Sequence, residues 1–248
     1  MNKISKPASN RPQIGTFIKS VSPHIVEILG LGPLDFVVLD AEHAPLDRST
    51  LDLLMLAGKA ACWPLVVRIP DMAASTILSV LDIGAAGLLV PHVDSAHQAR
   101  AVVAKAQYRG GERGFSSSPR AARYGTLGMK ECLVAAEGKL IIAQIESEAA
   151  VHSVKDILAV DGIDGIFIGR ADLALSFGLD DPKHAHVTQA TEQALESARS
   201  AGKIAGIAVG NVAERDLYAA LGANWIVVGS DQSLLRQAAQ AVAFSHAA

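Results

Sequence analysis

Eight short apolar runs, each followed by a segment with helical spacing, predict that this chain folds as a single (β/α)8 barrel, the TIM barrel. The 248 residues suffice for one large domain or for two small ones, and no linker or change of composition divides them. A doubly wound sheet is the alternative, but such folds normally stop at about five to seven strands. We therefore expect residues 1–12 to be a polar N-terminal tail and residues 13–248 to form one α/β barrel domain.

The predicted strands are largely continuous apolar runs, which is typical of parallel strands buried on both faces. In chain order they are 14–18, 36–39, 65–68, 87–90, 140–145, 165–168, 204–209 and 225–228. Their regular alternation with helical segments favours a closed barrel.

The predicted helices show apolar residues on one face. They are 49–61, 73–82, 95–107, 147–159, 188–200, 213–221 and 233–244. Asp47 or Ser49 caps the first of them, and a short helix opens at 169–171, directly after the sixth strand. The last helix ends in an alanine-rich face suited to close packing, made of Ala238, Ala239, Ala241 and Ala243. We therefore expect this helix to pack on, or exchange with, a neighbouring subunit in a homo-oligomer.

The connection between the fourth and fifth strands is unusually long, and its excess length lies in residues 108–131. This stretch is rich in Gly and Ser, and insertions between a strand and the next helix fall on the catalytic face of a barrel. We therefore expect an active-site loop here, with a plain surface insertion as the alternative.

Composition restricts the range of partners. The chain has 22 Lys and Arg against 25 Asp and Glu, for a net charge of −3, and it has no run of basic residues. We therefore expect neither nucleic acid nor an anionic membrane as a partner. No apolar stretch approaches the roughly 20 residues that span a bilayer, and the first residues lack the apolar region of a secretory signal, so we expect a cytoplasmic protein. The two cysteines, Cys62 and Cys132, are interpreted as small apolar residues.

Polar residues follow several of the predicted strands at the point where each apolar run stops. The second strand ends in Asp40-Ala41-Glu42-His43, the third in Arg68, the fifth in Gln144-Ile145-Glu146 and the sixth in Gly169-Arg170-Ala171-Asp172. Active sites in this fold gather at the C-terminal ends of the strands, so these residues should meet in one small mouth. Their carboxylates would repel one another without a bound cation.

Glu146 and Asp172 are the natural pair of metal ligands in this mouth, because they follow adjacent strands at equivalent height. Carboxylate oxygen together with water suits Mg²⁺ or Mn²⁺. The alternative, a helix cap at each position, fits Ser147 better than Glu146. Gln144 points the same way as Glu146 because strand side chains repeat every two residues, and a structural amide inside the barrel is its alternative role.

His43 is placed to act as a general base, since it titrates near neutrality and stands among carboxylates. Arg68 would serve as a donor to an enolate or a carboxylate, or else form a salt bridge to Glu42 or Asp40. Among the other histidines only His92 is expected to reach the mouth. Imine chemistry needs a lysine in the barrel, and only Lys19 ends a strand run, so metal activation is favoured.

Backbone N–H groups provide candidate anion sites at three strand ends. Those of Gly169, Arg170 and Ala171 could bind a substrate carboxylate. Gly210 and Gly229-Ser230, after the last two strands, could instead form a phosphate cup, which keeps a phosphorylated substrate open.

At these residues the sequence resembles the class II pyruvate aldolases of the 4-hydroxy-2-oxoheptanedioate and 2-dehydro-3-deoxyglucarate aldolase family, over roughly residues 13–235. Six blocks in the same order carry the resemblance. They are Asp40-Ala41-Glu42-His43-Ala44-Pro45; Val67-Arg68; Leu81-Asp82-Ile83-Gly84-Ala85 with Leu89-Val90-Pro91; Gly111-Glu112-Arg113-Gly114; Gln144-Ile145-Glu146-Ser147; and Gly162 to Gly169 running into Ala171-Asp172-Leu173.

The resemblance implies a role for each matching residue. It implies that Glu146 and Asp172 bind a divalent metal, with Co²⁺ or Zn²⁺ as alternatives to Mg²⁺ or Mn²⁺, and that Gln144 and Ala171 contact the keto acid. It implies that His43 accepts the proton and that Arg68 stabilises the transition state.

The resemblance also implies that Asp82 raises the basicity of the histidine. Asp82 ends a helix and should lie at the barrel floor, so we expect it to serve a neighbouring subunit or to be structural. The resemblance further implies a hexamer built as a trimer of dimers with exchanged C-terminal helices. Two residues depart from the family pattern: Arg170 stands where proline is usual, and Ala41 where glycine is commoner. An extra cation at Arg170 could shift the preference among keto acids.

The function expected is reversible cleavage of a 4-hydroxy-2-oxo acid to pyruvate, or a hydroxylated pyruvate, and an aldehyde, in aromatic or sugar acid catabolism. One alternative is an acyl-CoA lyase of the malyl-CoA or citrate-lyase type, although no basic cluster supports a nucleotide site. A second alternative is a catalytically silent, ligand-binding homologue, which the intact set of mouth residues argues against.

Overall fold

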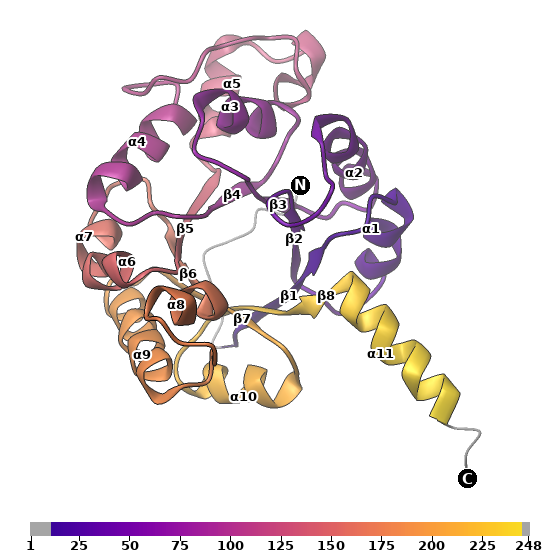
Figure 1. Ribbon diagram of the computed structural model, residues 1–248. Helices are drawn as coiled ribbons and strands as arrows, with labels where there is room; N and C mark the ends of the chain where they lie inside the picture. Colours follow the sequence, from indigo (N-terminus) through magenta and orange to yellow (C-terminus); the bar gives the residue numbers. More distant parts are fainter. Residues whose placement is uncertain (1–10, 245–248) are drawn as a thin grey trace.

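The computed structural model describes residues 11–244, which form a closed barrel of eight parallel strands surrounded by helices (Figure 1). Neighbours in sequence are neighbours in the barrel, and β8 pairs with β1 to close it. The strands are β1 (Gln13–Ile18), β2 (Phe36–Asp40), β3 (Leu65–Arg68), β4 (Gly87–Val90), β5 (Leu140–Ile145), β6 (Gly165–Ile168), β7 (Ile204–Val209) and β8 (Trp225–Ser230). The predicted TIM barrel is confirmed, while most of the predicted tail, residues 1–12, lies outside the described residues.

Helices follow the strands around the outside of the barrel. They are α1 (Pro23–Gly30), α2 (Arg48–Ala60), α3 (Ala74–Asp82), α4 (Ala96–Ala106), α5 (Met129–Ala136), α6 (Glu148–His152), α7 (Val154–Leu158), α8 (Arg170–Ser176), α9 (Ala185–Ser200), α10 (Val212–Ala220) and α11 (Asp231–Phe244), with a 3-10 helix η1 (Arg120–Gly125). Within the described range, no helix is both long enough and apolar enough to cross a membrane.

Side-chain caps fix several of the helix starts. Asp47 accepts a hydrogen bond from the backbone N–H of Thr50, at 2.7 Å, so the first of the two predicted capping residues is the one used. The predicted helix 147–159 is instead two short helices, because Ser153 leaves helical geometry at φ −92° and ψ 0°. Serine in a helix interior competes for backbone hydrogen bonds, which favours a break at this position.

The barrel interior is a packed core rather than a pore. The rings of Phe36 and Trp225 stack at 3.9 Å, and Phe167 meets Trp225 edge to face at 5.8 Å. Gly15 makes this packing possible, since a Cβ on it would lie 2.5 Å from the Phe36 ring. Because the interior is filled, ligands can enter only at the two ends of the barrel.

The expectation that residues 108–131 form a strand-to-helix loop at the mouth of their own chain is wrong. Helix α4 follows β4 closely, so the long segment comes after the helix and leads from α4 to β5. A connection from a helix to the next strand lies at the N-terminal ends of the strands, which we call the floor. The excess residues form η1 and α5 on that side of the barrel.

Helix α11 extends away from the barrel instead of lying along its wall (Figure 1). Its first residue, Asp231, is buried and accepts hydrogen bonds from the backbone N–H groups of Lys19 and Ser20, at 2.9 and 3.0 Å. Leu235 and Val242 farther along the helix are 70% and 68% exposed. The helix is therefore tied to the barrel at its start and leaves apolar side chains uncovered beyond it.

Candidate active site

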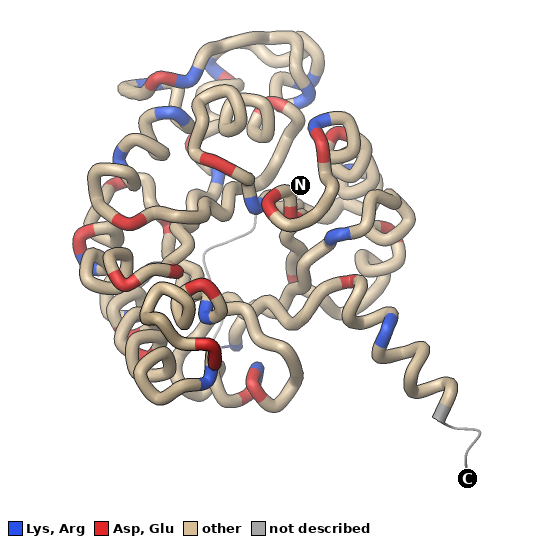
Figure 2. The backbone as a smooth tube through the Cα atoms, viewed as in Figure 1, with Lys and Arg blue, Asp and Glu red and all other residues tan. Residues whose placement is uncertain are grey.

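The mouth is the end of the barrel where the C-terminal ends of the strands meet, and it collects most of the predicted site residues. In Figure 2, acidic and basic positions lie near the centre of the ring of helices, where these strand ends converge. Residue Asp40 ends β2, Arg68 ends β3, and Glu146 directly follows β5. All three side chains are buried, so their charges act on one another with little screening by water.

Asp40 is a fully buried carboxylate held by two cations. Arg68 binds it through two hydrogen bonds, Nε to Oδ1 at 3.0 Å and Nη2 to Oδ2 at 2.7 Å, and Lys19 Nζ lies 3.1 Å from Oδ2. Burial alone would raise the pKa of Asp40, but its bonds to Arg68, the backbone N–H of His43 and Lys19 hold the pKa below its usual value. The salt bridge that was the plain alternative for Arg68 is therefore present, with Asp40 as its main partner.

Arg68 has one guanidinium nitrogen, Nη1, that is free to bind a ligand. Its Nη1 makes no hydrogen bond within residues 11–244, although Nε and Nη2 are engaged by Asp40 and Nε also lies 3.3 Å from Glu42 Oε2. The guanidinium carbon stands 4.7 Å from the centroid of the Phe17 ring, which supports the flat group from below. Arg68 is thus fixed in place with a free donor.

Glu42 is surrounded by titratable groups. Its carboxylate oxygens lie 3.5 Å from His43 Nε2 and 3.5 Å from His92 Nε2, in addition to the contact with Arg68. Burial raises the pKa of Glu42 above its ordinary value, and the nearby charge of Glu146 adds to this, against the lowering effect of Arg68. The imidazole of His43 itself is more than half exposed and faces the opening.

Glu146 is buried and held by polar groups of His92 and Gln144. The backbone N–H of His92 donates to Oε1 at 2.7 Å, His92 Nδ1 lies 3.0 Å from the same oxygen, and the amide of Gln144 donates to Oε2. A Cβ on Gly169 would approach Glu146 Oε2 to 3.2 Å, so the absence of a side chain keeps space beside this oxygen. The other amide atom, Gln144 Oε1, is buried with no hydrogen-bond partner among residues 11–244.

His92 reaches the mouth, as its position after the fourth strand predicted. The sequence did not indicate its backbone, which is in the left-handed region at φ +56°. Such a conformation is costly for a residue with a side chain and is found mainly at functional sites. Here it aims both the N–H and the imidazole at Glu146.

Arg170, the extra cation of the sequence analysis, is paired with a carboxylate. Its Nη2 lies 2.7 Å from Glu214 Oε2, and Nη1 donates to the hydroxyl of Tyr218 at 3.2 Å. Burial would raise the pKa of Glu214, but hydrogen bonds from Lys183 and Arg170 lower it to about 2. The guanidinium is therefore directed toward α10, where it shares the carboxylate of Glu214 with Lys183.

Ala171 and Asp172 lie exposed in the first turn of α8, directly after β6. In the described part of the chain, Asp172 makes no hydrogen bond or ion pair, so its carboxylate is free for a ligand.

Asp82 ends α3 at the opposite end of the barrel from His43, where Arg113 Nη2 binds it at 2.7 Å. Within one chain the structure thus does not bring Asp82 to the histidine.

The mouth fits a divalent cation. Its four carboxylates, Asp40, Glu42, Glu146 and Asp172, exceed Lys19 and Arg68 by two charges. Across residues 11–244 no three His, Cys, Asp or Glu side chains are placed to hold a metal ion together. A pair of carboxylates would suffice for an ion such as Mg²⁺, which completes its shell with water and substrate oxygen.

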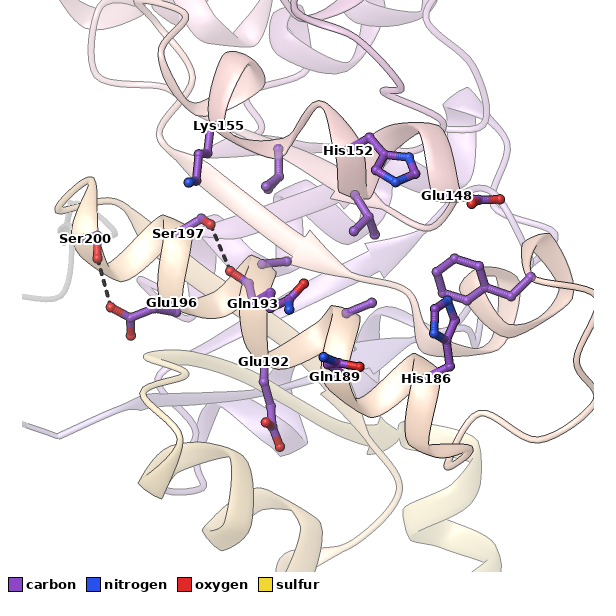
Figure 3. Close-up of a pocket in the computed structure, with 15 residues that line it drawn as sticks. Glu148, His152, Lys155, His186, Gln189, Glu192, Gln193, Glu196, Ser197 and Ser200 are labelled. Carbon is purple, nitrogen blue, oxygen red and sulfur yellow. Dashed lines mark hydrogen bonds between the residues drawn. The ribbon is translucent and has the colours of Figure 1, made fainter.

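A separate hollow lies on the outer wall of the barrel. It measures about 1070 Å³, and Figure 3 shows its walls, which come mainly from α6, α7 and α9. Among its lining residues, Phe177 and His186 meet edge to face at 4.3 Å between ring centroids. None of the predicted site residues lines it, so we place the active site at the mouth.

Fold and site together define a (β/α)8 barrel with an acidic, metal-suited mouth. The chain belongs to the HpcH/HpaI aldolase/citrate lyase family, which it matches over residues 13–238. The resemblance inferred from the strand-end motifs is thereby confirmed, and so is the prediction of a carbon–carbon lyase.

Relatives of known name match nearly the whole chain. One is a 5-keto-4-deoxy-D-glucarate aldolase of Klebsiella pneumoniae, 38% identical over 95% of this chain and 93% of its own. Another is a 2-keto-3-deoxy-L-rhamnonate aldolase of the same organism, 40% identical over 91% of this chain and 85% of its own. Among solved structures, a family member from Burkholderia cenocepacia is 30% identical with a TM-score of 0.93, covering 97% of this chain and 96% of its own.

Proposed function

We propose that this protein is a divalent-metal-dependent aldolase. It cleaves a 4-hydroxy-2-oxo acid to pyruvate, or a hydroxylated pyruvate, and an aldehyde. The observation that carries this proposal is the excess of strand-end carboxylates in the mouth of a chain from this lyase family. The two relatives named above act on keto-deoxy sugar acids, which favours that substrate class and a role in sugar acid catabolism. We place the enzyme in the cytoplasm, with neither nucleic acid nor membrane as a partner.

Glu146 and Asp172 would hold the metal, Mg²⁺ or Mn²⁺ by the hardness of their oxygens, with Co²⁺ or Zn²⁺ as alternatives. When bound, the ion supplies Lewis-acid polarisation of the keto acid. Gln144 and Ala171 would contact the keto acid, together with the N–H groups at Gly169 and Arg170. Two observations support this: Gly169 leaves space beside Glu146, and Gln144 Oε1 has no hydrogen-bond partner among residues 11–244.

His43 would take the proton from the C4 hydroxyl, directly or through a water molecule. The C3–C4 bond then breaks, the aldehyde leaves, and the electron pair passes into the enolate of pyruvate. Arg68 would donate from Nη1 to the enolate oxygen, where negative charge develops. Asp40 positions both residues, since it holds the Arg68 guanidinium and accepts from the backbone N–H of His43 at 3.1 Å.

The oligomer would be a hexamer built as a trimer of dimers, in which neighbouring subunits exchange α11. The projecting helix and its exposed Leu235 and Val242 support this, because apolar side chains of that size gain from burial in an interface. In such an assembly Asp82 would reach the His43 of a neighbour, or it would remain a structural partner of Arg113. Light scattering at micromolar concentration should give a multiple of 25.9 kDa, and a monomer would contradict the proposal.

Pyruvate release tests the activity directly. The chelated enzyme is assayed with 5-keto-4-deoxy-D-glucarate and with 2-keto-3-deoxy-L-rhamnonate, before and after adding Mg²⁺ or Mn²⁺. We expect turnover of at least one acid only after the metal is added. Failure to cleave any 4-hydroxy-2-oxo acid would favour the silent homologue, and cleavage confined to acyl-CoA thioesters would favour the acyl-CoA lyase.

A further inference from the structure

A second cavity lies at the barrel floor, away from every residue assigned to the mouth. It measures about 380 Å³ and lies beneath the first residues of β3, β4 and β5, between α2 and the segment that carries η1 and α5. Small-molecule sites usually measure about 300 to 1,000 Å³, so this floor cavity has the size of a ligand site. Part of its wall is apolar and includes Met55, Trp63, Leu65 and Leu127.

The floor cavity is strongly cationic. Its basic lining residues are Lys59, Arg113, Arg120, Arg123 and Lys139. The positive charge of two of them is balanced by a carboxylate. Arg113 pairs with Asp82 at 2.7 Å, and Arg120 pairs with Asp52 at 2.8 Å. The other three basic side chains have no carboxylate partner in the described part of the chain.

Several buried donors around the floor cavity also lack acceptors. The Nε–H groups of Arg113 and Arg120 are buried with no hydrogen-bond partner among residues 11–244. Lys139 Nζ donates to the backbone oxygen of Ala85 at 2.6 Å, which leaves its charge unbalanced. Burial and the nearby Arg113 charge lower the pKa of Lys139 to about 8. A buried cation and unfilled donors are unfavourable by themselves, and an anion would satisfy both.

The cavity is accessible from outside. Lys59, Arg123 and Val134 line it and are exposed, so it opens to solvent between α2 and α5. The two exposed cations would attract an anion to the opening, while the half-buried Lys139 is better shielded from solvent. An apolar wall next to these cations suits a molecule with one charged end and one apolar end.

We propose that the floor cavity binds a small organic anion, with its carboxylate or phosphate near Lys139 and Arg113 and its apolar body against Trp63 and Leu65. This site is separate from the aldolase mouth of the same chain and does not depend on the proposed reaction. It assigns a role to the long connection before β5, which encloses the cavity with η1 and α5.

Fluorescence titration with 8-anilinonaphthalene-1-sulfonate, an aromatic sulfonate, tests the site in the full-length protein. The titration is repeated with Asp172→Asn, a variant at the mouth, and an unchanged probe affinity there shows that the probe does not report on the mouth. We expect saturable binding of one probe per chain and at least about tenfold weaker binding in Lys139→Met, because a hydrogen bond to a charged group contributes about 1.5–3 kcal/mol. Lys130→Met is the matched control, since Lys130 is an exposed lysine of the same connection between α4 and β5 and does not line the cavity.

A second variant tests the site by blocking it, in case removing the charge of Lys139 changes the probe affinity only slightly. Ala135→Trp places a large side chain on the lining of the cavity and should abolish probe binding, with folding checked by circular dichroism. Displacement of the probe by benzoate but not phenyl phosphate would identify a carboxylate ligand, and the reverse a phosphate ligand. Absence of saturable binding, or wild-type affinity in both Lys139→Met and Ala135→Trp, would overturn the proposal.

Discussion

The two ends of this barrel carry opposite excess charge. At the mouth, four carboxylates outnumber the two cations Lys19 and Arg68, whereas at the floor five basic side chains face the carboxylates of Asp52 and Asp82. Both ends bury part of that charge, which is unfavourable unless a ligand of opposite sign completes it. We therefore expect a metal cation at the mouth and an organic anion at the floor.

The largest effect is expected from removing a metal ligand at the mouth. Glu146→Gln keeps the shape of the side chain and removes its charge, so turnover should fall about 10⁴-fold or more, because metal stabilisation contributes several kcal/mol and each 1.36 kcal/mol is tenfold in rate. Pyruvate release measures this. Glu148→Gln, exposed two residues farther on, is the matched control, and equal activity in the two variants would remove Glu146 from the site.

Loss of the proposed base should be the next largest effect. His43→Ala is expected to slow cleavage about 10²- to 10⁴-fold, the usual contribution of a general base, with little change in metal affinity. Steady-state kinetics at neutral pH checks the value against His97→Ala, an exposed histidine on α4. Full activity without His43 would assign proton removal to another group at the mouth.

Asp40→Asn should lower the free energy of unfolding by about 3–5 kcal/mol, because it leaves buried charge on Arg68 uncompensated. The folded-state pKa of Asp40 is below its unfolded value, so its contribution is complete above about pH 5 and is lost as pH falls through the folded pKa. Urea unfolding of both proteins between pH 2 and 7 should therefore show a difference that shrinks in acid. A pH-independent difference, or one as small as that of the exposed Asp216→Asn, would refute the pairing.

At the floor a smaller effect is expected, and its pH dependence lies in the alkaline range instead of in acid. Lys139 has a folded-state pKa of about 8 against about 10.4 when unfolded, so the unfolded chain binds more protons between these values. Stability should rise with pH from about 8 to about 10, and Lys139→Met should remove this rise while stabilising the protein at pH 7 by up to about 3 kcal/mol. Thermal unfolding against pH measures both, and an unchanged slope in the variant would show that Lys139 is not desolvated.

The fold was largely predictable because its signals are local. Each strand is an apolar run of four to six residues, and all eight predicted ranges match the observed strands within two residues at each end. The polar ends of those strands also placed Asp40, Arg68, Gln144 and Glu146 together at the mouth, since topology alone brings strand ends to one rim. The roles assigned to these residues stay predictions.

What the sequence did not predict depends on contacts between distant segments. Arg170 is paired with Glu214, 44 residues away, and no local pattern indicates that partner. The long connection before β5 was assigned to the wrong end because its composition resembles an active-site loop, while its place after α4 decides its location. The left-handed backbone of His92 likewise accompanies a hydrogen bond to Glu146, 54 residues away, which no local pattern indicates.

The central claim is that the mouth, and not the floor, holds a divalent metal between Glu146 and Asp172. Calorimetric titration with Mn²⁺ of the wild type, Glu146→Gln, Asp172→Asn and Lys139→Met tests it most directly. The account predicts one Mn²⁺ per chain in the wild type and in Lys139→Met, and at least about 100-fold weaker binding in both mouth variants. Unchanged Mn²⁺ affinity in Glu146→Gln and Asp172→Asn would contradict it.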